Sequence, residues 1–95
     1  MIVKVSPRAE RSILKIGEYI SKKGYPENAF KFLTRLGLFI KSLSILADKY
    51  PLCRNKSFAK RSFQCVPFEH NYIIIYKVEG DIVLIKNVVH AKRIH

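Results

Sequence analysis

The chain has 95 residues and a formal net charge of +11, from 18 lysines and arginines against 7 aspartates and glutamates. Its length allows one modest hydrophobic core, and an apolar content of 48% excludes an intrinsically disordered chain. The apolar runs are far shorter than the roughly 20 residues that cross a bilayer, and no segment has the order of a signal peptide. These features predict one cytoplasmic domain with an anionic partner, either nucleic acid or an acidic protein.

The N-terminal part is expected to form a strand and then a helix. Met1–Val5 is apolar and β-prone, and it stops at Ser6-Pro7, where serine can cap a helix and proline suits its first turn. Gly24 is expected to end this helix in the left-handed conformation. Apolar residues recur along the helix at spacings of three and four, at Ala9, Ile13, Ile16 and Ile20.

A second, longer helix is predicted from about Pro26 to Asp48. Because few residues separate it from the first helix, the two must fold back as an antiparallel pair. Gly37 costs about 1 kcal/mol relative to alanine in a helix interior, and we expect it to mark close packing between the helices. The core stripe of this helix comprises Ala29, Leu33, Leu36, Ile40, Leu43 and Ala47, widened by Phe32, Phe39 and Leu46.

The C-terminal half is predicted to form three strands. Ser62–Phe68 is the first, and Tyr72–Val78 and Ile82–Val89 form an antiparallel hairpin around Glu79-Gly80-Asp81. The resulting order is β-α-α-β-β-β. It corresponds to an α+β fold in which an N-terminal strand joins a mostly antiparallel sheet and a helical hairpin packs on one face of that sheet.

A first group of candidate functional residues is basic. The segment from Lys49 to Phe68 contains five basic residues and no acidic one. Such a cluster can be a solvated loop, can dock an acidic protein, or can hold phosphates. Phosphate-loop, CxxC, HExxH and nucleophile-elbow motifs are absent from the sequence, so we expect no metal and no cofactor. The candidates in this group are Arg54, Lys56, Lys60 and Arg61.

A second group lies at the end of the last predicted strand and comprises His90, Lys92, Arg93 and the terminal His95. Histidine titrates nearest to neutral pH and suits proton transfer, although a single histidine at a strand end also serves as a hydrogen-bonded structural residue. Strand alternation predicts which residues share each face of the sheet: His90, Val88 and Lys86 on one side, and Val89 and Asn87 on the other.

Cys53 and Cys65 are separated by 12 positions in a chain expected to be cytosolic. They are therefore predicted to be reduced thiols rather than a disulfide. Neither has the CxxC spacing or the histidine companions of a zinc site.

Several features together resemble a known family. A first strand leads through Ser-Pro into a helix with Ala9, and a second long helix is followed by Pro51 and Arg54. The most specific part is the hairpin sequence NYIIIYKV…NVVHAKR, which begins at Asn71 and ends at Arg93. This pattern resembles toxins of the RelE/ParE superfamily from bacterial type II toxin–antitoxin systems, and it is closer to the ParE branch.

The resemblance implies the β-α-α-β-β-β fold and an acidic, partly disordered antitoxin that folds on binding. Toxins of the ParE branch bind and poison DNA gyrase. We therefore expect a binding toxin rather than an enzyme. The antitoxin's acidic residues are expected on the surface from Lys49 to Arg61, and its apolar residues along the sheet or the helical hairpin. The predicted partner-binding residues are Arg54, Lys56, Lys60, Arg61, Lys92 and Arg93.

The alternative within the superfamily is a RelE-like endoribonuclease that cuts mRNA in the ribosome. The resemblance then implies Lys56, Arg61 and Arg93 as phosphate ligands, with His90 or His95 as proton donor. The catalytic residues would thus be Arg61, His90 and Arg93. RelE-branch enzymes also use a C-terminal tyrosine or histidine, and this chain has no tyrosine after its last strand. That departure favours the ParE interpretation.

Two further interpretations remain open at the level of sequence. The basic surface alone would also suit a nucleic-acid-binding module without toxicity, although the aromatic motifs of an RRM and a helix-turn-helix pair are missing. A degenerate toxin that has lost its activity would have the same sequence features.

Overall fold

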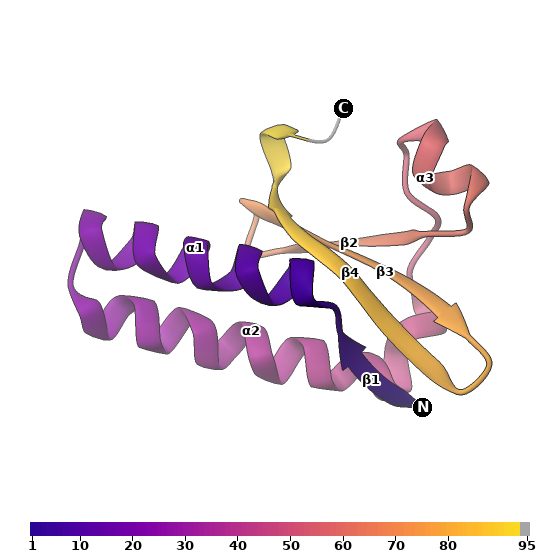
Figure 1. Cartoon of the computed structure of the whole chain (residues 1–95), viewed down its shortest axis with the longest axis horizontal. Coiled ribbons are helices and arrows are strands. Elements are labelled where there is room, and N and C mark those ends of the chain that lie inside the picture. Colours follow the sequence, from indigo (N-terminus) through magenta and orange to yellow (C-terminus); the bar gives the residue numbers. More distant parts are fainter. Residues whose placement is uncertain (94–95) are drawn as a thin grey trace.

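A computed structural model describes the backbone of residues 1–93 and the side chains of residues 1–92. A helical hairpin packs against a four-stranded sheet (Figure 1), which confirms the predicted α+β fold. Within the described residues, no helix is long and apolar enough to cross a membrane. The elements are β1 (Ile2–Val5), α1 (Pro7–Lys23), α2 (Pro26–Leu46), the 3₁₀ helix η1 (Ala47–Lys49), α3 (Lys56–Lys60), β2 (Gln64–Phe68), β3 (Tyr72–Glu79), β4 (Ile82–His90) and the 3₁₀ helix η2 (Ala91–Arg93).

The sheet has the strand order β1-β4-β3-β2. β1 pairs with β4 in parallel, whereas β4 with β3 and β3 with β2 are antiparallel pairs. The parallel pair follows from the connection, because the α1–α2 hairpin crosses over between β1 and the rest of the sheet (Figure 1). The sheet is therefore mostly antiparallel, as predicted.

Ser6 fixes the first helix to the sheet. Its Oγ accepts a hydrogen bond from the Ala9 N–H at 3.0 Å, which caps α1, and donates one to the Lys86 carbonyl at 2.8 Å. Pro7 occupies the first helical position, as predicted. The expected left-handed conformation of Gly24 is wrong, because its φ is −140°. The extended residue Tyr25 then leads into α2, which starts at Pro26.

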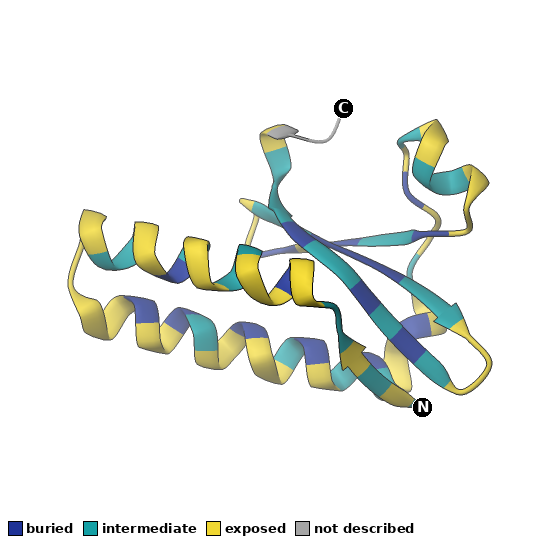
Figure 2. Ribbon diagram, in the orientation of Figure 1, coloured by how far each residue is buried: buried dark blue, intermediate teal, exposed yellow. Residues whose placement is uncertain are grey.

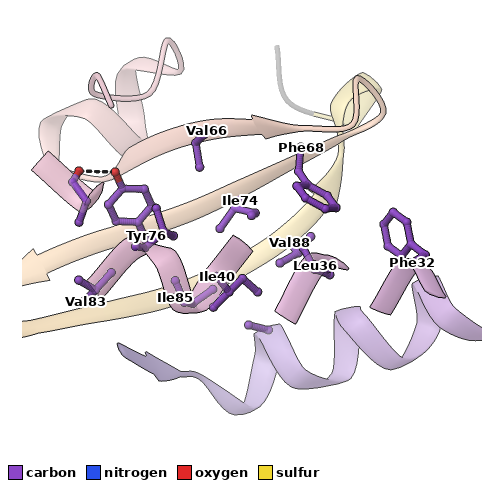
Figure 3. Packing of buried hydrophobic residues seen from close by; sticks show 13 residues of the cluster. Phe32, Leu36, Ile40, Val66, Phe68, Ile74, Tyr76, Val83, Ile85 and Val88 are labelled. Atoms are coloured by element: carbon purple, nitrogen blue, oxygen red, sulfur yellow. Dashed lines mark hydrogen bonds between the residues drawn. The ribbon is translucent and has the colours of Figure 1, made fainter. Parts of the chain in front are cut away.

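The main core lies between the helical hairpin and one face of the sheet, where buried residues line the facing sides of the elements (Figure 2). Figure 3 shows Phe32, Leu36 and Ile40 of α2 packed toward the strand residues. Tyr76 is the largest fully buried side chain, and its hydroxyl donates a hydrogen bond to the Ala47 carbonyl. The same carbonyl accepts a second bond from Gln64 Nε2 at 2.8 Å. These bonds join the end of α2 to β2 and β3.

The predicted role of Gly37 is wrong. Gly37 is exposed, and a Cβ placed on it would meet no atom within 4 Å. The close approach of the two helices occurs instead at Gly17 of α1, where a Cβ would lie 2.9 Å from Leu33 Cδ1. The glycine that permits helix packing therefore lies on the first helix.

A second, smaller cluster lies on the opposite face of the sheet. The sequence predicted only a basic loop here, but residues 56–60 form α3, with Asn55 Oδ1 accepting a hydrogen bond from the Phe58 N–H at 3.1 Å. Phe58 packs edge-to-face on Phe63, with ring centroids 6.0 Å apart. The cluster is built from Cys53, Phe63 and Ile75, with Phe58, Cys65, Ile73 and Val89 around them.

Replacing Tyr76 by phenylalanine is expected to cost about 1 kcal/mol of unfolding free energy. The hydroxyl's bond to the Ala47 carbonyl is lost, as is the longer bond that it accepts from Gln64 Nε2 at 3.3 Å, while Gln64 still donates to the Ala47 carbonyl. Burial, followed by the nearby Tyr50 and Asp48, raises the pKa of Tyr76 to about 12. Between pH 10 and 12 the unfolded chain loses this proton before the folded one, so the stabilisation is complete below pH 10 and is lost toward pH 12. Urea unfolding at several pH values should show this component in the wild type and not in Tyr76→Phe. Parallel curves for both proteins would contradict it.

Gly37→Ala is expected to stabilise the protein by about 0.5–1 kcal/mol, since alanine restricts the unfolded chain and nothing obstructs its methyl group. Thermal and urea unfolding would measure the change. Gly17→Ala is the matched control: it gains the same helix propensity but must displace the Leu33 side chain. Equal stabilisation by both substitutions would show that the two helices do not approach closely at Gly17.

Candidate functional site

The predicted basic residues around α3 are all exposed. Lys56 and Lys60 begin and end α3, Arg54 precedes the helix, and Arg61 follows it as the C-terminal cap. The Arg61 guanidinium donates a hydrogen bond to Ser57 Oγ at 3.2 Å, one turn earlier. The structure therefore presents these four cations on and beside one short helix, which lies next to the start of β2 (Figure 1).

The sheet adds lysines that the sequence did not indicate, and two of them lie in one row. Lys77 of β3 is paired with Leu84 of β4, and Leu84 is paired with Lys4 of β1. Directly paired residues point to the same side of a sheet, so Lys77, Leu84 and Lys4 form one row across three strands. Lys77 alternates with Tyr76 of the main core and is therefore on the α3 side of the sheet.

Lys86 joins this row through its contact with Phe63. Its Nζ lies 4.9 Å from the centre of the Phe63 ring, and the Lys77 Nζ lies 5.7 Å from the same centre. Ammonium groups at such distances are attracted by the ring's electron density. Phe63 thereby positions two cations above the smaller hydrophobic cluster.

The predicted face for Lys86 is wrong because β4 contains a bulge. Ile75 pairs with Asn87 and Tyr76 pairs with Ile85, which leaves Lys86 without a partner in the register. Strict alternation therefore fails at this point. His90 and Val88 do share the side of the sheet on which α1 and α2 pack. Lys86 lies on the opposite side, with α3. Asn87 Oδ1 accepts a hydrogen bond from Ser12 of α1 at 2.6 Å.

We call this surface the basic face, defined as Lys4, Lys77 and Lys86 of the sheet with Arg54, Lys56, Lys60 and Arg61 around α3. The described side chains form one ion pair, between Arg35 and Glu69 at 2.7 Å, and the N-terminal amine lies 3.9 Å from Asp81. The hydrogen bond from Arg35 lowers the pKa of Glu69, which shows that the Glu69 carboxylate interacts with Arg35. Neither pair includes a side chain of the basic face.

His90 lies on the other side of the sheet from α3. Its ring stacks edge-on against Tyr72, with centroids 5.6 Å apart, and its Nδ1 accepts a hydrogen bond from the Lys92 N–H at 3.3 Å. It lines an open cleft of about 550 Å³ together with Ser12, Lys15 and Tyr19 of α1. The structure thus does not bring His90 together with Arg61. The Arg93 side chain and all of His95 lie outside the described residues, and Lys92 is exposed on η2.

The prediction of reduced cysteines is contradicted. Cys53 and Cys65 form a disulfide, with their Cα atoms 4.7 Å apart. Although 12 positions separate them, α3 reverses the chain so that residues 51–53 run alongside β2. The Cys53 N–H bonds to the Phe63 carbonyl at 3.0 Å, and the Cys65 N–H bonds to the Pro51 carbonyl at 3.3 Å. The spacing of the two cysteines does not predict this reversal of the chain. The helix that produces it is only five residues long, which is too short to show a periodic pattern in the sequence.

The arrangement provides positive charge beside a sheet surface that α3 covers in part. Within the described part of the chain, no three histidine, cysteine, aspartate or glutamate residues come close enough to hold a metal ion. What the face can do chemically is bind an extended or helical anionic surface.

Comparison with known proteins identifies the chain. A search of curated protein sequences gives no significant match. The structure is similar to a chain of the solved chromosomal ParDE TA system from P. aeruginosa, with a TM-score of 0.81, 18% sequence identity and 95% of each chain covered. A family model described as the ParE toxin of the type II toxin–antitoxin system parDE matches residues 3–95. The chain therefore belongs to the ParE toxin family of type II toxin–antitoxin systems.

Proposed function

We propose that this toxin acts in the cytoplasm by binding and poisoning DNA gyrase, and that an acidic antitoxin neutralises it by docking on the basic face. Membership of the ParE family over residues 3–95 is the observation that supports this function most strongly. The similar structure from P. aeruginosa is described as a ParDE toxin–antitoxin system, which supports a cognate antitoxin for this chain as well.

The basic face has the properties that an acidic antitoxin requires. Its lysines and arginines are not neutralised by the ion pairs of the described residues, so their repulsion is relieved when an acidic partner binds. The sheet also offers apolar side chains between the lysines, since Ile2 is 58% exposed and Leu84 lies between Lys4 and Lys77. A segment that carries acidic and apolar residues would match both kinds of contact.

The arrangement of the candidate catalytic residues supports a binding toxin over the nuclease alternative. A RelE-like mechanism needs a proton donor close to the basic phosphate ligands. Here His90 stacks on Tyr72 and lines the cleft beside α1, whereas Arg61 caps α3 on the opposite side of the sheet. Among the described residues, the cations around α3 thus provide positive charge for binding, but no histidine that could donate a proton lies beside them.

The double variant Lys77→Glu/Lys86→Glu is expected to weaken antitoxin binding roughly tenfold at low salt. It replaces the two ammonium groups above Phe63, which would attract an acidic partner, by carboxylates that would repel it. Isothermal titration of the toxin with its cognate antitoxin would measure the affinity, and the difference should shrink as salt rises.

Lys31→Glu/Lys41→Glu is the matched control, because it makes the same change in net charge on exposed positions of α2. It should weaken binding much less than the variant on the sheet. Equal losses from the two double variants would show that total charge, not the basic face, determines affinity.

Purified toxin is expected to inhibit supercoiling by gyrase and to increase the amount of cleaved DNA, and added antitoxin should reverse both effects. An agarose-gel supercoiling assay with a toxin titration would test this directly. A ribosome-dependent mRNA cleavage assay on the same sample separates the two branches. Cleaved mRNA with unaffected supercoiling at excess toxin would reject the gyrase target.

A further inference from the structure

The two sulfurs of the Cys53–Cys65 disulfide lie in different surroundings. Cys53 is only 4% exposed and is part of the smaller hydrophobic cluster with Phe63 and Ile75. Cys65 is partly exposed in β2 and lines an open cleft of about 530 Å³. A small molecule can therefore approach the bridge from the Cys65 side, whereas the cluster covers Cys53.

The cleft beside Cys65 is mostly apolar and has one positive charge in its lining, that of Arg54. Arg54 lines it, together with Asn55, Leu52 and Ile73, and no carboxylate is among the described residues around it. Lys56 begins α3 two residues after Arg54. Anions are attracted to such a cleft, and a volume of this size is sufficient for a ligand as large as a short peptide.

We propose that Cys65 is a site of reversible S-thiolation by a small acidic thiol of the glutathione type. The thiolate of the incoming molecule attacks Cys65 Sγ, a new S–S bond forms between the two, and the Cys65–Cys53 bond breaks. Cys53 Sγ leaves as a thiolate and takes a proton from solvent. A second thiolate then attacks the sulfur of the attached molecule, and the bond between that sulfur and Cys65 Sγ breaks. The small-molecule disulfide is released and Cys65 Sγ leaves as a thiolate that takes a proton from solvent, so the protein gains two electrons and two small thiols are oxidised.

The fold keeps the reverse reaction available. The Cys53 and Cys65 segments are joined by backbone hydrogen bonds, from the Cys53 N–H to Phe63 and from the Cys65 N–H to Pro51, and these do not depend on the disulfide. After thiolation the Cys53 thiol therefore stays next to Cys65 and can displace the attached group. Cys53 is thus the resolving cysteine of the pair. This inference does not depend on the target of the toxin.

Single-cysteine variants test the assignment of the two roles. Cys53→Ser leaves Cys65 accessible, and incubation with oxidised glutathione should add one glutathionyl group to it, seen by intact-protein mass spectrometry. Cys65→Ser leaves only the covered Cys53 and should remain unmodified under the same conditions, with circular dichroism confirming that both variants are folded. Faster modification of Cys65→Ser than of Cys53→Ser would overturn the proposal.

Reduction kinetics of the wild-type protein provide a second test that needs no cysteine substitution. At equal thiolate concentration, glutathione should reduce the bridge about two- to fivefold faster than the cationic thiol cysteamine. Arg54→Gln should remove most of that difference and leave the rate with neutral 2-mercaptoethanol unchanged, whereas Lys49→Gln, outside the cleft, should have little effect. Equal rates with glutathione and cysteamine in the wild type would show that the cleft does not select an acidic thiol.

Discussion

The central strand β3 must be buried on both of its faces, and the rest of the structure depends on this requirement. Ile74 and Tyr76 point into the core beneath the helical hairpin, while Ile73 and Ile75 point into the smaller cluster beneath α3. One hairpin can cover only one face of a sheet, so the second set of apolar residues needs cover of its own. The short helix α3 supplies it through Phe58, and in doing so it brings the basic segment onto the sheet.

α3 covers only part of this second face of the sheet, and lysines lie on the part that it leaves exposed. α3 lies over the part of β3 that pairs with β2. Among the described residues, no helix packs on this face farther toward β1. A strand face left open to water usually carries polar side chains, and here these are Lys4 and Lys77. These lysines thus lie on the same face as Ile2 of β1, whose apolar side chain is exposed.

Local patterns in the sequence were sufficient to predict the fold, because the long helices and the final hairpin have strong periodicity and clear boundaries. Features that depend on contacts between distant segments were not predictable. The β4 bulge moves Lys86 to the other face, the α3 turn brings Cys53 to Cys65, and Gly17 rather than Gly37 lies in the helix contact. Each of these depends on a neighbour that is far away in the sequence.

In the candidate site, too, some residues could be predicted from local sequence and others could not. The cations near α3 could be identified because they lie close together in the sequence, but Lys77 and Lys86 are isolated positive charges within apolar strands. Alone, each looks like an ordinary solvent-facing strand residue. They act together because Phe63, which belongs to neither strand, lies beneath both ammonium groups. The ring is held by Phe58 of α3, so the same small cluster that covers β3 also fixes the spacing of the cations that face an acidic partner.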